Sequence, residues 1–308
     1  MRCPTLNALP APPAGRVGWP WTVETPPLPE RMPGLLRQGD GLSVVACAKA
    51  EAQGGAWPRI SIVVASLNHG AYVEEMLRSV LLQGYPDFEL IVIDGGSDRA
   101  TLDVFEKYRP WLTYFVSEPD RGQSHALNKG MARISGNLFS HLDNDDYLLP
   151  ACLAAVARAS LTEPGKVIAG GVVRTVVGSQ HREIHRPLPH DLHAYAQWWN
   201  TQHHGGPGMF FPTGHLPAIG DVDESLNFLM DYDYTLRFLA VMHGRRADAA
   251  ALQQLADALA RLRRDDFDDS PRERARQFDR RAVGDQLAVV EYRQPVTTLG
   301  LVHQVGRH

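Results

Sequence analysis

The sequence predicts an α/β protein with a mostly parallel sheet flanked by helices, and three observations lead to this prediction. Between residues 58 and 173, apolar runs of strand length alternate with segments of helical periodicity. The apolar runs are nearly continuous, as in strands that are buried on both faces. Several runs end directly in polar residues, at the place where parallel sheets bind ligands. Such alternation is typical of a sheet that helices cover on both faces.

The expected elements follow one another regularly along the chain. Strands are expected for five apolar runs, at residues 60–65, 90–93, 113–116, 138–142 and 166–173. Helices are expected between them, at residues 72–81, 99–108, 126–134 and from Pro150, because proline suits a first helical turn. After an irregular stretch at 174–230, which is long enough to indicate a functional loop region, residues 231–243 are expected to be helical again.

Three parts of the chain are expected. Residues 1–57 are rich in Pro, Gly and Ala, so we expect an extended arm that Trp19 and Trp21 hold in place. Residues 58–245 are expected to form the α/β domain. Residues 246–308 are expected to form a helical C-terminal extension, mainly because residues 248–264 have the composition of a helix.

The composition excludes some classes of function. The 308 residues carry a formal net charge of -4, which does not indicate a nucleic-acid partner. No apolar run is long enough to span a bilayer, and the N-terminus lacks the pattern of a secretory signal. The cysteines are far apart and fit a reducing compartment. We therefore expect a cytoplasmic protein, and we leave peripheral association with the inner face of the membrane open.

The run Asp143-Asn144-Asp145-Asp146 at the end of the fourth expected strand is the strongest candidate for chemistry. Carboxylates this close repel one another unless a cation or hydrogen-bond donors lie among them. The Asp-x-Asp spacing lets Asp143 and Asp145 approach one hard divalent ion. The alternative is that Asp145 or Asp146 caps the helix expected from Pro150. The run alone gives both interpretations equal weight.

Other polar residues also follow expected strands. Ser66 and Asn68 follow the first strand, and Asp94 follows the second. Asp94 is a candidate to accept a hydrogen bond from a base or ribose, and alternatively it stabilises the Gly-Gly turn after it. Together these residues place polar groups along one edge of the sheet, where a nucleotide would lie.

Arg121 precedes a predicted helix and is a candidate to face a phosphate near the N-terminus of that helix. The alternative is an ion pair with Glu118 or Asp120, two acidic neighbours in the sequence.

Four segments resemble the family-two glycosyltransferases of the GT-A fold in order and spacing, from about residue 58 to residue 239. They are Ile62-Val63-Val64-Ala65-Ser66-Leu67-Asn68, Ile93-Asp94-Gly95-Gly96-Ser97, Ser117-Glu118-Pro119-Asp120-Arg121-Gly122-Gln123-Ser124 and Leu142-Asp143-Asn144-Asp145-Asp146. The resemblance implies a Rossmann-like GT-A fold and a uridine, guanosine or thymidine diphosphate sugar as donor. It also implies a divalent cation, Mn2+ or Mg2+, as cofactor.

The resemblance assigns roles to particular residues. Ser66 and Asn68 match the first nucleotide-binding loop of the family, and Asp94 matches its base-binding aspartate. Asp143 and Asp145 match the metal motif, with Asp145 as the favoured direct ligand and Asp143 also beside the donor.

A second resemblance lies on the acceptor side of the family's site. Asp231 takes the position of the catalytic base, and Asp233 is the runner-up. N-capping of the helix at 231–243 is the structural alternative, and we favour catalysis for Asp231 and a structural role for Asp233. The chain lacks the Gln-x-x-Arg-Trp motif of processive synthases after Asp231, which favours transfer of a single sugar, and the resemblance implies that the transfer inverts the anomeric carbon.

Two departures from the family pattern support a rival hypothesis. The chain has Leu67 where the family usually has an aromatic residue that packs on the base, and His125 where relatives often have aspartate. A non-catalytic GT-A-fold binding or assembly protein is therefore the alternative, although the intact acidic run and Asp231 argue against it. A nucleotidyltransferase would need a lysine in its glycine-rich first loop, which is absent here. The acceptor is expected to be a glycan, lipid-linked or other hydroxyl compound of cell-wall or polysaccharide synthesis.

Overall fold

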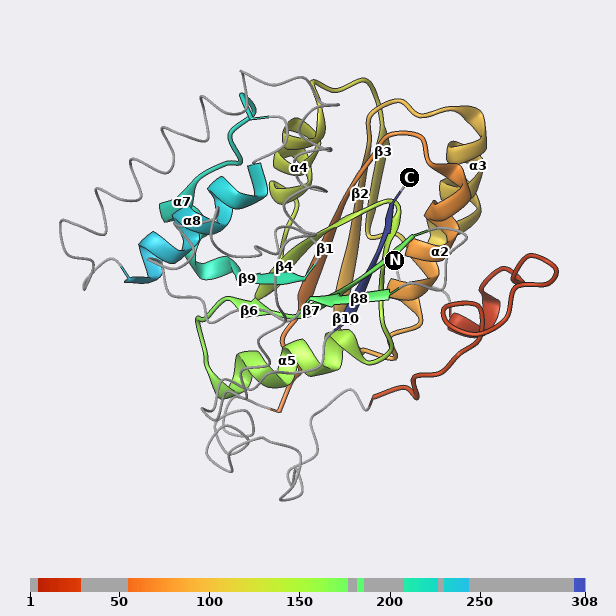
Figure 1. Cartoon of the computed structure of the whole chain (residues 1–308), viewed down its shortest axis with the longest axis horizontal. Coiled ribbons are helices and arrows are strands. Elements are labelled where there is room, and N and C mark those ends of the chain that lie inside the picture. Colours follow the sequence, from red (N-terminus) through yellow and green to blue (C-terminus); the bar gives the residue numbers. More distant parts are fainter. Residues whose placement is uncertain are drawn as a thin grey trace.

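A computed structural model describes residues 5–28, 55–176, 182–185, 208–226, 230–243 and 302–307. Within these residues, a six-stranded sheet with the order β3-β2-β1-β4-β9-β6 forms the centre of the molecule (Figure 1). Its strands are β1 (Ile60–Ser66), β2 (Phe88–Asp94), β3 (Tyr114–Ser117), β4 (Leu138–Asp143), β6 (Ile168–Ala169) and β9 (Met209–Pro212). Strands β1 to β4 are parallel, and β9 pairs antiparallel with both β4 and β6. The predicted mostly parallel sheet is thus confirmed.

Helices cover both faces of this sheet. They are α2 (Gly70–Leu81), α3 (Arg99–Tyr108), α4 (Gln123–Met131), α5 (Cys152–Thr162), α7 (Leu216–Ile219) and α8 (Met230–His243). Short 3-10 turns lie at Leu6–Ala8, Arg109–Trp111 and Thr213–His215. None of the helices in the described part of the chain is long and apolar enough to cross a membrane.

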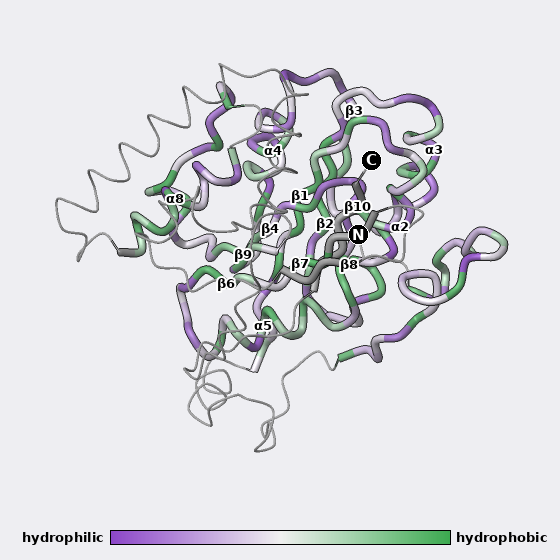
Figure 2. Tube along the Cα trace, viewed as in Figure 1, coloured by the Kyte–Doolittle hydropathy of each residue, from purple (hydrophilic) through white to green (hydrophobic). Residues whose placement is uncertain are grey.

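Side-chain alternation along β1 divides the core into two layers. Ile60, Ile62 and Val64 pack in one cluster with residues of α2, α3 and α5, whereas Val63 and Ala65 pack in another with residues of α4 and α8. Figure 2 shows hydrophobic residues along the central strands, as burial on both faces requires. The near-continuous apolar runs in the sequence follow directly from this arrangement.

A second, smaller sheet has the order β5-β10-β7-β8. Its strands are β5 (Asp146–Leu148), β7 (Gly171–Val176), β8 (Arg182–His185) and β10 (Val302–Arg307). Strand β10 pairs antiparallel with β5 and parallel with β7, so a segment near the end of the chain lies beside the α/β domain (Figure 1).

One expectation about this region is corrected. The single strand expected at 166–173 is two strands, β6 and β7, in different sheets, because the strand is interrupted at Gly170, whose N–H donates to the carbonyl oxygen of Gly208. Within the extension expected at residues 246–308, the structure describes a strand at 302–307, and residues 246–301 lie outside the described part, so the helical extension stays a prediction.

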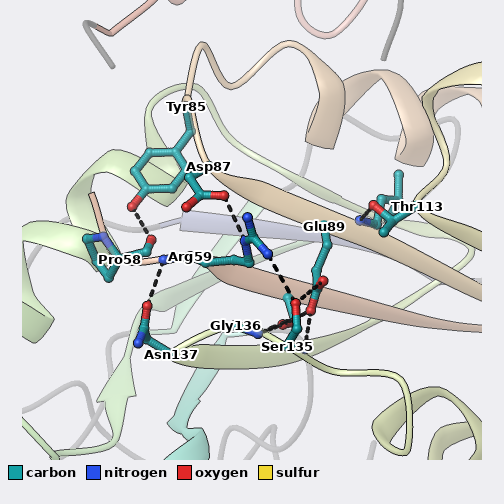
Figure 3. A network of polar contacts seen from close by, with 11 residues as sticks. Pro58, Arg59, Tyr85, Asp87, Glu89, Thr113, Ser135, Gly136 and Asn137 are labelled. Atoms are coloured by element: carbon teal, nitrogen blue, oxygen red, sulfur yellow. Dashed lines mark hydrogen bonds and ion pairs between the residues drawn. The ribbon is translucent and has the colours of Figure 1, made fainter. Parts of the chain in front are cut away.

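A polar network fixes the strand ends opposite the candidate site (Figure 3). The buried Glu89 carboxylate accepts hydrogen bonds from Ser61 Oγ at 2.5 Å, from Ser135 N and Oγ at 2.6 and 2.8 Å, and from Gly136 N at 3.2 Å. Burial by itself raises the pKa of Glu89, but these donors hold it below its usual range. Arg59 Nε pairs with Asp87 at 2.8 Å beside it. The network thereby joins β1, β2 and the turn before β4.

The N-terminal arm contacts β5 and α2 through its tryptophans. Trp19 Nε1 donates to the carbonyl oxygen of Leu148 at 2.7 Å, and Trp21 is buried. The buried Arg78 guanidinium lies 5.7 Å from the ring centroid of Trp21 and donates to the carbonyl oxygens of Pro10, Pro20 and Trp21.

Candidate functional site

The candidate site lies at the carboxyl ends of β1 and β4. The chain runs outward from β1 through β2 to β3 and then returns to the other side of β1 as β4, so the direction of strand order reverses between β1 and β4. Ligands in open α/β sheets bind at such a reversal. The register places Asp143 opposite Ala65 and Asp94 opposite Ser66, so the sequence-predicted residues Ser66, Asp94 and Asp143 lie at one edge.

Asn144 joins the first loop to the acidic run. Its Nδ2 donates to Ser66 Oγ at 3.0 Å and to the carbonyl oxygen of Asn68 at 2.9 Å, and its side chain is buried. Asn68 and His69 both adopt the left-handed region, with φ of 62° and 66°. Non-glycine residues in this region are strained and cluster at functional sites. In the sequence, only its position between the two aspartates distinguishes Asn144.

Asp94 is fully buried and its carboxylate is surrounded by donors. It accepts hydrogen bonds from Gly96 N at 3.1 Å, Ser97 N at 2.9 Å and Ser117 Oγ at 2.6 Å, and from Ser97 Oγ. The structure therefore gives Asp94 the turn-stabilising role that was its alternative. The base-binding role stays a prediction.

The three aspartates of the acidic run have different surroundings. Helix α5 begins at Cys152 after an N-cap at Ala151, with no side-chain capping hydrogen bond, so the expectation that Asp145 or Asp146 caps this helix is wrong. Asp146 is buried and instead begins β5. Asp145 Oδ2 lies 3.8 Å from His69 Nδ1. The carboxylate of Asp143 is held by Gln123 Nε2, which donates to its Oδ1 at 2.7 Å.

Negative charge accumulates at the end of β4. Burial raises the pKa of Asp143 to about 6, with the charges of Asp231 and Asp145 acting in the same direction and His141 and Gln123 opposing them. Burial lowers the pKa of His141, but the carboxylates of Asp231 and Asp143 outweigh this and raise it to about 9. His141 offsets part of this negative charge, and a divalent cation would stabilise the remaining carboxylates.

The donor set fits a hard cation that a ligand helps to hold. No group of three or more His, Cys, Asp or Glu side chains is arranged as a metal site among the residues that the structure describes. Mg2+ is commonly held by one or two carboxylates together with substrate phosphates and water. Asp143 and Asp145 supply such a pair, and Gln123 orients the first of them, as outer partners do for metal ligands.

The two candidate bases in α8 have different surroundings. Asp231 lies in the first turn with 28% of its side chain exposed, and its Oδ1 lies 3.2 Å from His141 Nε2. Asp233 is buried, and its Oδ2 lies 2.8 Å from Nε and 2.7 Å from Nη2 of Arg237. Arg237 also donates to the carbonyl oxygens of Ile219 and Asp221. Only Asp231 is therefore both accessible and beside the acidic run, and Asp233 anchors the segment before α8.

Arg121 has a partner that the sequence did not predict. Its Nη2 and Nε lie 2.6 and 3.1 Å from Glu224 Oε2, so the expected pairing with Glu118 or Asp120 is wrong. Glu118 pairs with Lys129, and Asp120 accepts a hydrogen bond from Gly122 N. The guanidinium is mostly exposed, with 68% of the side chain accessible.

Helix α4 is hydrogen-bonded to the segment before α8. Asn128 Nδ2 donates to the carbonyl oxygen of Val222 at 2.9 Å, and its Oδ1 accepts from Val222 N at 2.8 Å. Ser124 Oγ donates to the carbonyl oxygen of Leu226 at 3.1 Å. The two sides of the site are thus held at a fixed separation by one helix.

Comparisons with known proteins place the chain in a family. The model of the family described as Glycosyl transferase family 2 matches residues 61–216, just over half of the chain. A glycosyltransferase of Mycobacterium tuberculosis that is itself uncharacterised is 28% identical over 183 residues, which cover 58% of this chain and 68% of the relative. A PGL/p-HBAD biosynthesis glycosyltransferase of Mycobacterium bovis is 28% identical over 185 residues, which cover 58% of this chain and 69% of the relative.

Among solved structures, S. aureus TarS 1–349 in complex with UDP-GlcNAc is 22% identical to the chain, with a TM-score of 0.47. The similarity covers 59% of this chain and 53% of TarS 1–349, so the chain spans about half of that structure.

Proposed function

Because this chain belongs to glycosyl transferase family 2, we propose that it transfers one sugar from a nucleoside diphosphate to an acceptor hydroxyl group, with inversion. The observation that carries the proposal is the meeting of Asp143, Asp145 and Asp231 at the ends of β4 and α8. Their mutual repulsion is reflected in the pKa of Asp143, which burial and the neighbouring charges raise to about 6. This arrangement provides a place for a cation beside an accessible carboxylate.

Donor binding is proposed for the loops at the ends of β1, β2 and β4. Ser66 and Asn68 are held in place by Asn144, and Asp94 shapes the neighbouring turn. When bound between Asp145 and Asp143, a Mg2+ or Mn2+ ion supplies positive charge that stabilises the leaving diphosphate. Arg121 is proposed to contact a donor phosphate, for which it must exchange its exposed pairing with Glu224.

Acceptor activation is proposed for Asp231. Its carboxylate takes the proton of the attacking hydroxyl group while the hydroxyl oxygen forms the new bond to the anomeric carbon and the diphosphate leaves. Direct displacement by a hydroxyl from the opposite face inverts this carbon through an oxocarbenium-like transition state. The partial exposure of Asp231, beside the metal-binding candidates, supports this role.

The acceptor is proposed to be a glycan, lipid-linked or other hydroxyl compound of cell-surface glycan synthesis. Phe210 and Phe211, which lie in the aromatic stretch before α8, are buried in the core and not available to an acceptor. Residues 186–207 of that stretch lie outside the described part of the chain.

A thermal-shift panel tests the proposal. Uridine, guanosine, thymidine and cytidine diphosphates are each added with and without MnCl2, since a ligand that binds the folded state raises its melting temperature. We expect a manganese-dependent shift for one nucleotide, and loss of that shift in Asp145→Ala. Asp103→Ala is the matched control, because Asp103 is an exposed carboxylate on α3 that forms an ion pair with its helix neighbour Arg99. No shift with any nucleotide would favour the non-catalytic alternative.

A further inference from the structure

His141 occupies an apolar position in the fold. Side chains alternate along β4, so Phe139, His141 and Asp143 share one face of the strand. On that face Phe139 packs against Phe211 and Phe238, with ring centroids 5.3 and 6.2 Å away. His141 is only 7% exposed, and Val63 lies opposite it in β1. An apolar side chain would suit this position, so the imidazole needs a separate reason.

Asp231 is the partner that compensates the buried imidazole. A buried polar group costs free energy unless it is paired. His141 Nε2 lies 3.2 Å from Asp231 Oδ1 as an ion pair, and in the described part of the chain this nitrogen makes no hydrogen bond of good geometry. The two residues are brought together by the packing of α8 against β4. Nothing in the sequence pattern indicates this pairing, because the residues are 90 positions apart.

The surroundings leave the imidazole little freedom. A cavity beside the pair has a volume of about 10 Å³, and its wall includes Val63, Phe139 and Met230. This volume is roughly that needed for one water molecule. The imidazole is therefore fixed by close packing, whereas Asp231 is at the edge of the core with 28% of its side chain exposed.

We infer that His141 is a positioning residue for Asp231, which it holds by one carboxylate oxygen so that the other oxygen stays available to the acceptor hydroxyl. The inference rests on the proposed function, because it gives a role in transfer only if Asp231 is the base. His141 itself exchanges no proton in the step. A carboxylate at a partly exposed helix start has several rotamers, and a misplaced reacting group lowers the rate of the chemical step.

The test compares two variants of similar shape. His141→Gln keeps an N–H donor near the position of Nε2, and His141→Met has similar length without a donor. We expect His141→Met to lower kcat for manganese-dependent hydrolysis of UDP-GlcNAc or GDP-mannose by roughly 10- to 100-fold, within the range of lost positioning effects. The donor KM should change less than about twofold, since binding of the donor does not involve the pair. His141→Gln should recover most of kcat.

A double-mutant cycle separates positioning from a structural role. In an Asp231→Asn background, His141→Met should cost much less than in the wild type, because residues acting as one unit are not additive. Equal losses in the two backgrounds would overturn the inference, as would an undiminished kcat in His141→Met. Should His141→Met fail to fold, His141→Asn replaces it, because its shorter amide cannot reach Asp231.

The same experiment distinguishes failure of the proposed function from failure of the inference about His141. A wild-type protein that shows no manganese-dependent nucleotide binding and no donor hydrolysis overturns the proposed function together with the inference. A wild-type protein that binds and hydrolyses donor, with His141→Met equally active, overturns the inference alone. Melting temperatures of all variants, measured without ligand, show whether any loss of kcat arises from unfolding.

Discussion

Replacing Asn144 by leucine should loosen the two loops that form the proposed donor site. The amide of Asn144 is 5% exposed and donates to Ser66 Oγ and to the carbonyl oxygen of Asn68. Leucine has the same branched skeleton as asparagine, so the change removes these two hydrogen bonds without opening a cavity. At about 1 kcal/mol for each bond, the free energy of unfolding should fall by about 2 kcal/mol.

This loss can be measured as a change in melting temperature. For a domain of this size, 1 kcal/mol corresponds to about 2–4 °C, so Asn144→Leu should lower the melting temperature by roughly 4–8 °C. Calorimetry gives the melting temperature, and donor titration should show weaker nucleotide binding in the same variant. Ser66→Ala is the partner for a double-mutant cycle, since it removes only one of the two acceptors.

Three results would refute parts of this reasoning. A melting temperature unchanged by Asn144→Leu would mean that the left-handed loop at Asn68 and His69 is stable without the amide. A lower melting temperature with unchanged nucleotide affinity would mean that the loop does not contact the donor. Additive effects of Asn144→Leu and Ser66→Ala would show that their hydrogen bond contributes no coupling.

Three further predictions follow from the carboxylates. The folded-state pKa of Glu89 is lowered, so its contribution to stability is present above about pH 4.5 and is lost as the pH falls through the folded pKa. Glu89→Gln should therefore make the free energy of unfolding less dependent on pH in this acidic range. Urea titrations from pH 3 to 7 at about half-unit steps measure this dependence. Asp231→Asn should keep manganese-dependent nucleotide binding but lower transfer by roughly 100-fold or more; surviving transfer would assign the base to another residue. Glu224→Gln should release Arg121 and tighten nucleoside diphosphate binding by roughly twofold to fivefold, as an exposed ion pair would allow; unchanged affinity in calorimetric titration would remove Arg121 from the donor site.

The central strands could be predicted from the sequence because each depends on a local apolar pattern. Strands β1, β2 and β4 are buried on both faces, so each appears as a continuous apolar run that ends where the chain leaves the core. The GT-A fold expected from the four segments is confirmed by the family match and by the parallel order of β1 to β4. Trp19 and Trp21 contact the domain as expected, because they are too large and apolar to remain in solvent, whereas the extent of the arm at residues 1–57 stays a prediction.

The features that the sequence did not predict depend on contacts between distant residues. The pairing of Arg121 with Glu224 joins residues 103 positions apart, and nothing in the local pattern distinguishes Glu224 from the nearer Glu118. The pairing of β10 with β5 and β7 is of the same kind. Helix α5 has no side-chain cap from the acidic run because Asp146 belongs to strand β5, which ends before the helix begins.

The hydrogen bonds around each carboxylate distinguish structural from functional acids in this fold. Glu89 and Asp94 are both buried, and each accepts four hydrogen bonds, so their charges are satisfied within the protein. Asp233 is satisfied by two nitrogens of Arg237. Asp143, in contrast, accepts a side-chain hydrogen bond from Gln123 in the described part of the chain, and its pKa is raised to about 6 by burial and by neighbouring acids. Since clustered carboxylates at the end of a strand repel one another, a ligand that supplies positive charge would stabilise this arrangement, in keeping with the proposed function. The same comparison explains why Asp94 and Asp143, opposite one another across β1, should differ in role although both end a strand with an aspartate.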